Sequence, residues 1–158
     1  MPSAEAVTTP IGVLQITGSS SGIERIAFVR KGAAGGDVPS RVRACARQLR
    51  EYFQGERTEF RGMKLKRAGT AFQRKVWREL KRVPYGRTVT YGEIARRIGH
   101  PRAAQAVGSA VRANPLAILI PCHRVIPARG GVGEYAGGKL RKRWLVKWEE
   151  HSSRYVSS

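Results

Sequence analysis

The chain has 158 residues, of which 41% are hydrophobic and 26% charged. This size suits one full-sized domain, or a small domain joined to a core of about 90 residues, and the mixture provides a buried core and excludes wholesale disorder. Lysine and arginine number 30 against 11 aspartate and glutamate, a formal net charge of +19. A polyanion such as nucleic acid is therefore the expected partner. The excess is uneven, since residues 1–69 carry 12 basic and 6 acidic side chains and residues 70–158 carry 18 and 5. We expect phosphate contacts in the second part.

Several classes of protein are excluded by pattern. No run of about 18 apolar residues is present, so no membrane span is predicted. The first twenty residues lack a basic segment followed by an apolar run, so a secretory signal is not expected. Two cysteines cannot build a disulfide framework, and three histidines show no zinc-site spacing. We expect a cytoplasmic monomer (nucleoid-associated if prokaryotic) without a metal or other cofactor.

The first part of the chain is predicted to be a small α/β unit. Residues 1–10 are polar, contain two prolines and are expected to form a loose end. Two runs rich in branched residues, 11–16 and 23–29, flank a Gly-Ser turn and predict a β-hairpin. Apolar positions at helical spacing predict a helix that begins at Ser40 as its N-cap. Residues 57–66 are predicted to form a strand.

The second part is predicted to be mainly helical. Thr70 with Gln73 three residues later is a capping box, and the helix that it begins ends before Pro84. Residues 88–91 are predicted to be short and extended. The last helix is expected to turn four apolar side chains inward, namely Leu140, Trp144, Leu145 and Trp148.

Two short helices, over residues 93–98 and 102–112, are separated by Gly99-His100, with Pro101 in the first turn of the second helix. The spacing fits a helix-turn-helix and an ordinary helical hairpin equally well. The positive charge favours the DNA-binding interpretation. The fold class is therefore α+β, with an N-terminal structural domain and linker over 1–69 and a mainly helical domain with a helix-turn-helix over 70–158.

Cys122 follows a buried apolar run and opens the sequence Cys-His-Arg. An isolated cysteine at such an edge is usually an inert small hydrophobe, as we expect for Cys45. Here His123 is adjacent and Arg124 adds positive potential, and such neighbours lower the pKa of a thiol. Because side chains of adjacent residues usually diverge, a water bridging Cys122 and His123 is favoured over direct contact. Glu149 is either surface charge at a helix end or a functional partner, because that end is unfavourable for an acidic residue.

The segment Gly130–Lys139 is rich in glycine and contains the spacing G-x-x-x-x-G-K. Leu140 stands where a metal-binding Ser or Thr belongs, and no apolar strand precedes the loop, so we reject nucleotide hydrolysis. A glycine-rich loop around Tyr135 fits instead a wall that lets a flat ring approach backbone groups.

A set of short segments in the second part carries a resemblance. They are Phe72-Gln73, Val76-Trp77, Pro84-Tyr85-Gly86, Tyr91-Gly92, Asn114-Pro115, Pro121-Cys122-His123-Arg124-Val125, Tyr135-Ala136-Gly137-Gly138 and Trp144-Leu145. The set resembles the O6-alkylguanine-DNA alkyltransferase family. The similarity covers nearly all of residues 70–158 and extends weakly into residues 10–60.

The resemblance implies a DNA repair protein that flips an O6-alkylguanine out of double-stranded DNA and takes its alkyl group irreversibly, once per molecule. O4-alkylthymine is the poorer substrate. The implied catalytic residues are Cys122 as acceptor, His123 as base acting through water, Glu149 orienting the imidazole, Asn114 bracing the segment, and Tyr91 donating a hydrogen bond to the purine. The implied guanine pocket comprises Tyr135, the Ala136 backbone and the carbonyls of Cys122 and Val125.

The resemblance also implies how DNA is held. The residues concerned are Arg102 and Arg112 on phosphates, with Ala104 and Gly108 on a small-residue helix face in the minor groove. Gln105 stands where the family usually places an arginine that enters the base stack. Glutamine lacks the charge and the planar stacking cation, so we expect weaker base flipping unless Arg102 compensates.

Two other hypotheses remain. A non-catalytic protein that binds and flags alkylated DNA is the first, although relatives of that kind carry tryptophan at the acceptor position. A thiol hydrolase is the second, although no oxyanion-hole motif is present and the helix-turn-helix would be idle. Transfer to Cys122 requires a sulfur that can ionise and that an extruded purine can reach.

Overall fold

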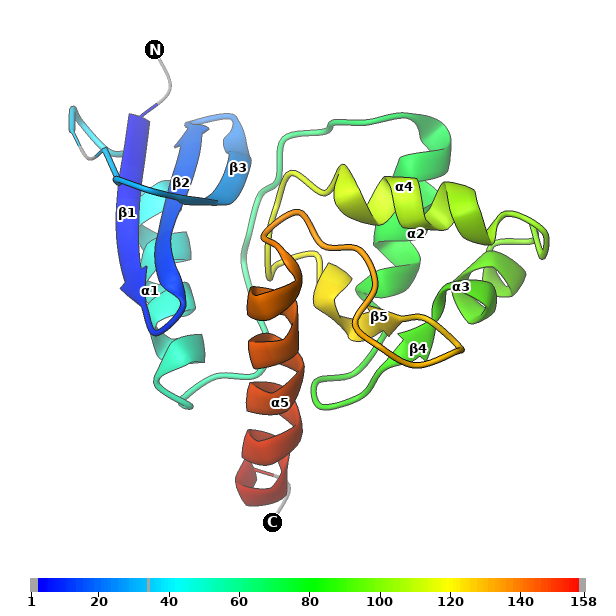
Figure 1. Cartoon of the computed structure of the whole chain (residues 1–158). Helices are drawn as coiled ribbons and strands as arrows, with labels where there is room; N and C mark the ends of the chain where they lie inside the picture. Colours follow the sequence, from blue (N-terminus) through cyan, green and yellow to red (C-terminus); the bar gives the residue numbers. More distant parts are fainter. Residues whose placement is uncertain (1–2, 34, 157–158) are drawn as a thin grey trace. The chain divides into compact units, whose positions relative to one another are not determined.

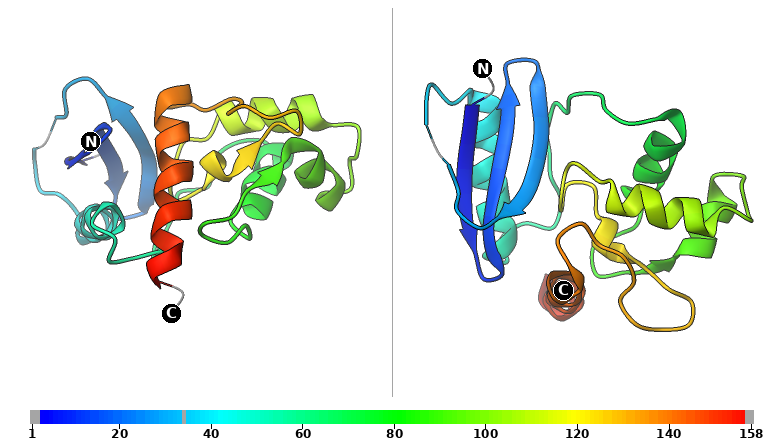
Figure 2. Two further views of the ribbon diagram at one scale, coloured as in Figure 1. Left: turned by 60° about the horizontal axis from the view of Figure 1, so that its bottom comes forward. Right: turned by 45° about the horizontal axis from the view of Figure 1, so that its top comes forward.

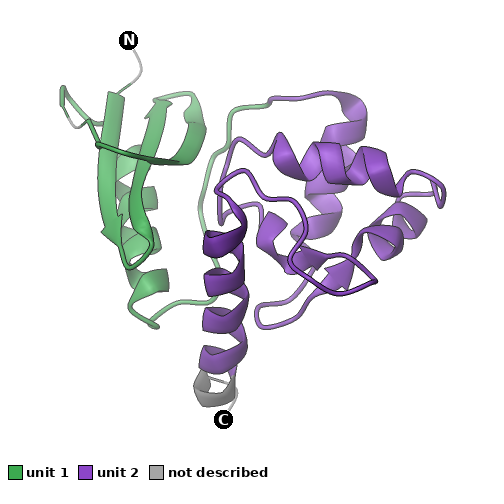
Figure 3. Ribbon diagram, viewed as in Figure 1, with its two compact units in different colours: residues 1–67 green, residues 68–158 purple. Residues whose placement is uncertain are grey.

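The computed structural model of the chain describes residues 3–33 and 35–156. The chain divides into two compact units, residues 1–67 and 68–158, two residues before the boundary drawn from the sequence (Figure 3). A small sheet-and-helix unit is followed by a mainly helical one, so the predicted α+β fold class is confirmed.

The first unit is a three-stranded antiparallel sheet with one helix packed on it (Figure 1). Its strands are β1 (Ser3–Thr9), β2 (Gly12–Ser19) and β3 (Gly22–Val29), and its helix is α1 (Ser40–Phe53). The predicted hairpin is thus confirmed as β2 and β3. The loose end expected over residues 1–10 is wrong for Ser3–Thr9, which pairs with β2 along its whole length and buries Val7 and Thr9, while residues 1–2 lie outside the described ranges.

Two further expectations for this unit are corrected. Ser40 is the first residue of α1 rather than its cap, because Pro39 holds the N-cap position and no side chain caps the helix. The strand predicted over residues 57–66 does not form. Only Leu65 pairs, in an isolated parallel bridge with Ile23 made by the Lys64 carbonyl and the Lys66 amide at 2.8 Å each.

Cys45 lies in the core of the first unit, as expected. Its side chain on α1 is fully buried, and burial, with a smaller contribution from the Glu5 carboxylate, raises the pKa of Cys45 to about 12. This thiol is therefore unreactive at neutral pH.

In the second unit, helices pack around a parallel pair of two-residue strands (Figure 2). In chain order its elements are α2 (Ala71–Leu80), β4 (Val89–Thr90), α3 (Tyr91–Arg97), α4 (Ala104–Arg112), the 3-10 turn η1 (Cys122–Arg124), β5 (Val125–Ile126) and α5 (Lys139–Val156). The ladder pairs Val89 with Val125 and so joins the segment before α3 to the segment after Cys122. The capping box of Thr70 and Gln73 is present at the start of α2.

The two short helices are α3 and α4, which pack on each other across a turn that contains Gly99. Their boundaries differ from the predicted ones. Helix α3 begins at Tyr91 because Thr90 and Glu93 form a second capping box, with the Thr90 hydroxyl accepting from the Glu93 amide at 3.1 Å. Helix α4 begins only at Ala104, so Pro101 lies in the turn and not in the first turn of the helix.

Helix α5 also corrects the sequence analysis. Leu145 is buried, but Leu140 is 79% exposed and does not face the core. The helix continues to Val156, so Glu149 lies inside it, buried, and is not surface charge at its end. No helix in the described ranges is both long and apolar enough to span a bilayer.

Candidate active site

Cys122 is presented by a tight turn that Asn114 holds closed. The Asn114 side chain accepts from the Leu116 amide and donates to the Ile120 carbonyl, both at 2.9 Å. Between Leu116 and Ile120, Ile118 adopts φ 74°, a conformation that β-branched residues rarely take. Such strain persists only where surrounding contacts enforce it. Asn114 therefore braces the segment that leads into Cys122.

The Cys122 thiol is fully buried. Burial raises its pKa well above the usual range, although the Lys142 ammonium and a hydrogen bond from the Asn114 side chain both act to lower it. The prediction that neighbours lower this pKa is therefore wrong for the free chain, in which the thiol is protonated. The cation that acts on the thiol is Lys142, which the sequence analysis missed.

His123 and Glu149 form a buried pair. The Nε2 atom of His123 lies 2.7 Å from Oε2 of Glu149, and among the described residues nothing hydrogen-bonds its other ring nitrogen, Nδ1. Burial opposes ionisation of Glu149, but His123 and Arg124 outweigh it and hold the pKa of this carboxyl far below its usual range. Because the carboxylate is ionised it accepts the hydrogen bond, so Nε2 carries a hydrogen, and in a neutral imidazole the lone pair is then on Nδ1.

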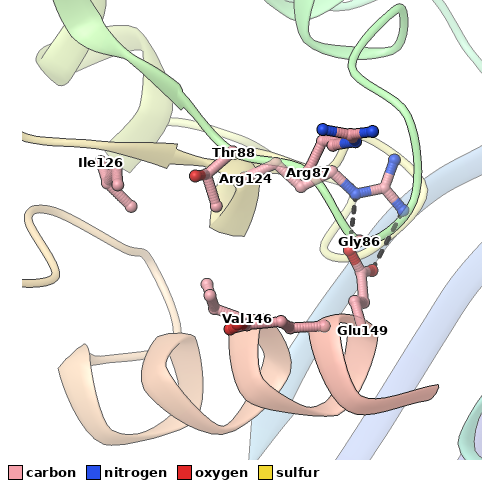
Figure 4. A pocket seen from close by; sticks show the side chains of 8 residues that line it. Gly86, Arg87, Thr88, Arg124, Ile126, Val146 and Glu149 are labelled. Atoms are coloured by element: carbon pink, nitrogen blue, oxygen red, sulfur yellow. Dashed lines mark hydrogen bonds and ion pairs between the residues drawn. The ribbon is translucent and has the colours of Figure 1, made fainter. Parts of the chain in front are cut away.

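Arg124 binds the same carboxylate rather than facing the thiol. Its Nε donates to Oε1 of Glu149 at 2.7 Å and its Nη2 to Oε2 at 3.0 Å (Figure 4). Its Nη1 donates to the Val83 carbonyl at 2.7 Å. The expectation that Arg124 adds positive potential at Cys122 is therefore wrong, since Glu149 neutralises its charge.

Tyr91, Glu134 and Lys142 form a second cluster. The Tyr91 hydroxyl accepts from the Glu134 amide at 2.9 Å and from the Lys142 ammonium at 3.3 Å. The ammonium also donates to the Glu134 carbonyl at 2.9 Å. Burial lowers the pKa of Lys142 to about 8. One signal could have identified this lysine, because Lys142, Leu145 and Glu149 share a helix face by their spacing.

The glycine-rich loop approaches Tyr91 closely. Gly133 has φ +77°, and a Cβ placed on it would lie 2.6 Å from the Tyr91 hydroxyl. Of the pocket residues expected on this loop, Tyr135 is buried, its hydroxyl has no partner among the described residues, and its ring lies edge-on to His123 at 6.5 Å. Ala136 is exposed, whereas Val125 in β5 is buried.

The residues expected to contact DNA lie on and before α4. Arg102 and Gln105 are exposed, Ala104 and Gly108 half-buried, and Arg112 is exposed with its Nε 3.9 Å from a Glu134 carboxylate oxygen. A Cβ on Gly108 would lie 3.9 Å from the Tyr91 ring, so the small-residue face of α4 adjoins Tyr91. His100 and His151 are exposed, and His151 lies within α5. Within residues 3–33 and 35–156, no three His, Cys, Asp or Glu side chains are grouped as metal ligands.

Comparison with known proteins identifies the family. Residues 71–151 match the DNA-binding domain of 6-O-methylguanine DNA methyltransferase, and residues 5–66 match its ribonuclease-like domain. A methylated-DNA–protein-cysteine methyltransferase of Methanosarcina acetivorans is 45% identical over 89% of this chain and 94% of its own length. One of Mycolicibacterium paratuberculosis is 43% identical over 93% of this chain and 92% of its own.

Solved structures agree with the sequence relatives. The crystal structure of Mycobacterium tuberculosis O6-methylguanine methyltransferase matches with a TM-score of 0.84 and 39% identity, covering 96% of this chain and 94% of that one. The structure of the M. tuberculosis protein in complex with DNA matches with a TM-score of 0.83 and 40% identity, covering 93% and 92%. The chain therefore belongs to the methylated-DNA–protein-cysteine methyltransferase family.

Proposed function

We propose that this protein repairs duplex DNA by moving an alkyl group from O6 of guanine to the sulfur of Cys122, each molecule acting once. The observation that carries the proposal is the buried Nδ1 of His123, which has no hydrogen-bond partner within residues 3–33 and 35–156 and is next in sequence to the thiol, with Nε2 held by an ionised Glu149. A lone pair without a partner is costly to bury and is suited to receive a proton. Family membership supports the reaction class, and O4-alkylthymine is the poorer substrate.

The proposed step balances as a displacement at carbon. The thiol proton passes through a bridging water to Nδ1 of His123 while the sulfur forms a bond to the alkyl carbon. The bond from that carbon to O6 breaks, its electron pair stays on the guanine, and the guanine takes up a proton from water to become the normal base. Tyr91 donates a hydrogen bond to the purine as charge develops on it. The thioether is stable, so Cys122 is not regenerated.

Proton removal and attack must be coupled in this site. Burial keeps the free thiol protonated, so His123 has to act as the base when the substrate is in place. The Lys142 ammonium then stabilises the sulfur anion as it forms, because it is the cation that lowers the pKa of Cys122.

Binding of the flipped base also requires a local opening. Cys122 is fully buried, and the Tyr91 hydroxyl is occupied by Glu134 and Lys142. We infer that residues 127–138 carry the Glu134 amide away from Tyr91 when the purine enters, and that the Lys142 side chain releases the hydroxyl as well. The released phenol is then available to the base.

The proposed DNA contacts offset the cost of flipping, a few kcal/mol. The small-residue face of α4, with Ala104 and Gly108, enters the minor groove, and Arg102 and Arg112 bind phosphates. Arg112 exchanges its contact with Glu134 for a phosphate oxygen. Gln105 fills the space left by the base. We further propose that the protein acts as a monomer in the cytoplasm, associated with the nucleoid if the source is prokaryotic.

A binding protein for alkylated DNA without chemistry is the second candidate, favoured by the complete burial of Cys122. Intact-mass spectrometry after incubation with an O6-methylguanine duplex separates the two. Transfer adds one methyl group per protein, located on the Cys122 peptide, and Cys122→Ser abolishes the addition while duplex binding persists. An unmodified Cys122, or a methyl group on Cys45, contradicts the proposed transfer.

A further inference from the structure

Arg124 shares one carboxylate with His123. Oε2 of Glu149 accepts from His123 at 2.7 Å and from Arg124 at 3.0 Å, and Oε1 accepts from Arg124 at 2.7 Å. The three side chains are buried, with exposed fractions of 0%, 8% and 2% for His123, Arg124 and Glu149. A two-point contact from a guanidinium sets the plane of the carboxylate, which a single hydrogen bond leaves free to rotate.

We propose that Arg124 is a positioning residue for the alkyl transfer. Its two hydrogen bonds to Glu149 direct Oε2 at Nε2 of His123, and this leaves Nδ1 unprotonated and free to take the thiol proton. This inference rests on the proposed function. The path of the thiol proton through water to His123, with Glu149 behind it, is here called the relay. The family resemblance placed only His123 and Glu149 in it, and the proposal adds Arg124.

The charge of Arg124 matters as much as its geometry. A buried carboxylate bound only to an imidazole favours the imidazolium form, which has no lone pair to accept a proton. The Arg124 cation binds the same carboxylate, so less of the Glu149 charge acts on the His123 ring. Other charged or titratable groups lie around His123 and Glu149 and are unchanged in the Arg124 variants below. They are Tyr85 and Arg87 before β4, Cys122 beside His123, Tyr135 on the glycine-rich loop, and Lys142 and Glu150 on α5.

The guanidinium is itself anchored on its far side. Its Nη1 donates to the Val83 carbonyl at 2.7 Å, and its central carbon lies 5.7 Å from the centre of the Tyr85 ring. Three of its nitrogens are thus committed, two to Glu149 and one to a backbone oxygen. A lysine ammonium at this position cannot reproduce the planar fork.

A cleft gives access to this side of the relay. Arg124 and Glu149 line a hollow of about 430 Å³, together with Gly86, Arg87, Thr88, Ile126, Val146 and Glu150 (Figure 4). A small guanidinium ion can therefore reach the Glu149 carboxylate when the Arg124 side chain is shortened. Chemical rescue then becomes a direct test of the contact.

The experiment measures the single-turnover rate of methyl transfer to Cys122, at saturating O6-methylguanine duplex, as a function of pH. Because a general base contributes roughly 10²–10⁴-fold, we expect Arg124→Ala to slow transfer by at least about tenfold near neutral pH. The acid limb of the pH profile of this variant is expected to move to higher pH, since the Glu149 carboxylate then acts on His123 alone. Millimolar methylguanidinium is expected to restore part of the rate in this variant and to leave the wild type unchanged.

The matched control is Arg87→Ala, which removes an exposed arginine from the same cleft, and it is expected to keep both the wild-type rate and its pH profile. Should Arg124→Ala not fold, Arg124→Lys carries the test, because it keeps the charge but loses the fork, and its rate is expected to fall severalfold. A wild-type rate and pH profile in a folded Arg124 variant, or a slowing that is equal at all pH values and not rescued, overturns the inference. A wild-type protein that never methylates Cys122 contradicts the proposed function instead, so the two failures are distinguishable.

Discussion

The ammonium of Lys142 lies 3.3 Å from the hydroxyl of Tyr91, so a cation from α5 meets the phenol at the start of α3. The same ammonium acts on the Cys122 thiol and lowers its pKa against the effect of burial. One lysine thus connects the nucleophile to the proposed purine contact, although these three residues are 20 or more positions apart in the chain. The charge of this lysine is therefore expected to control the reaction.

Lys142→Met is expected to slow alkyl transfer by about tenfold at pH 7, the effect of raising the thiol pKa by one unit. Burial lowers the pKa of Lys142 to about 8, so the ammonium is present below that pH and is lost above it. The wild-type rate should therefore break near pH 8, and the variant should lack this break. Lys147→Met, an exposed lysine of the same helix, is the control for general loss of charge. Identical pH profiles for wild type and Lys142→Met would exclude a role for the cation.

Glu149→Gln is expected to destabilise the fold by about 3–5 kcal/mol at pH 7, because Arg124 is left buried without its counter-ion. The folded pKa of Glu149 is depressed, so its contribution to stability is present above the unfolded value of about 4.3 and is lost as pH falls through the folded one. The difference between wild type and variant should therefore shrink on acidification below about pH 4. Urea unfolding at several pH values measures this, with the exposed Glu150→Gln as the control. A difference in the free energy of unfolding that stays constant over this pH range would contradict an ionised, stabilising Glu149 in the folded protein.

Gly133→Ala is expected to push the glycine-rich loop away from Tyr91, since its Cβ would lie 2.6 Å from the hydroxyl. Cys122 should then react faster with a small thiol reagent in the free protein. Gly130→Ala is a matched control, because Gly130 also has a positive φ, of +93°, but nothing lies within 4 Å of its Cβ position. Both variants cost about 1 kcal/mol for a Cβ in the left-handed region. Equal labelling rates for the two would show that the loop does not cover the thiol.

Gln105→Arg is expected to raise the rate of transfer from duplex DNA more than from free O6-methylguanine. Gln105 is exposed on α4, and arginine adds a planar cation that stacks and hydrogen-bonds in the space left by the flipped base. The measurement is the ratio of the two single-turnover rates. A change in the chemical step alone alters both rates by the same factor and leaves this ratio unchanged. An equal effect on both substrates would remove Gln105 from the flipping step.

Elements held by interactions between residues close in sequence could be predicted, whereas elements that depend on distant partners could not. The capping box at Thr70 and the hairpin of β2 and β3 involve residues close in sequence, and both are confirmed. Strand β1 was missed because its short sequence, which has a proline in the chain at either end, is ordered by pairing with β2. The strand expected over 57–66 failed for the converse reason, since only Leu65 finds a partner there.

The chain by itself determined the family, the fold class, the position of the thiol motif and the excess of charge, because these are properties of residue identity and spacing. Only the tertiary structure decided which cation serves which acid. Arg124, two residues from Cys122, is bound to Glu149, whereas Lys142, twenty residues away, acts on the thiol. The reason is physical: a side chain's partner depends on which elements pack around it, and burial in that packing raised the pKa of Cys122 against the expectation from its neighbours in sequence.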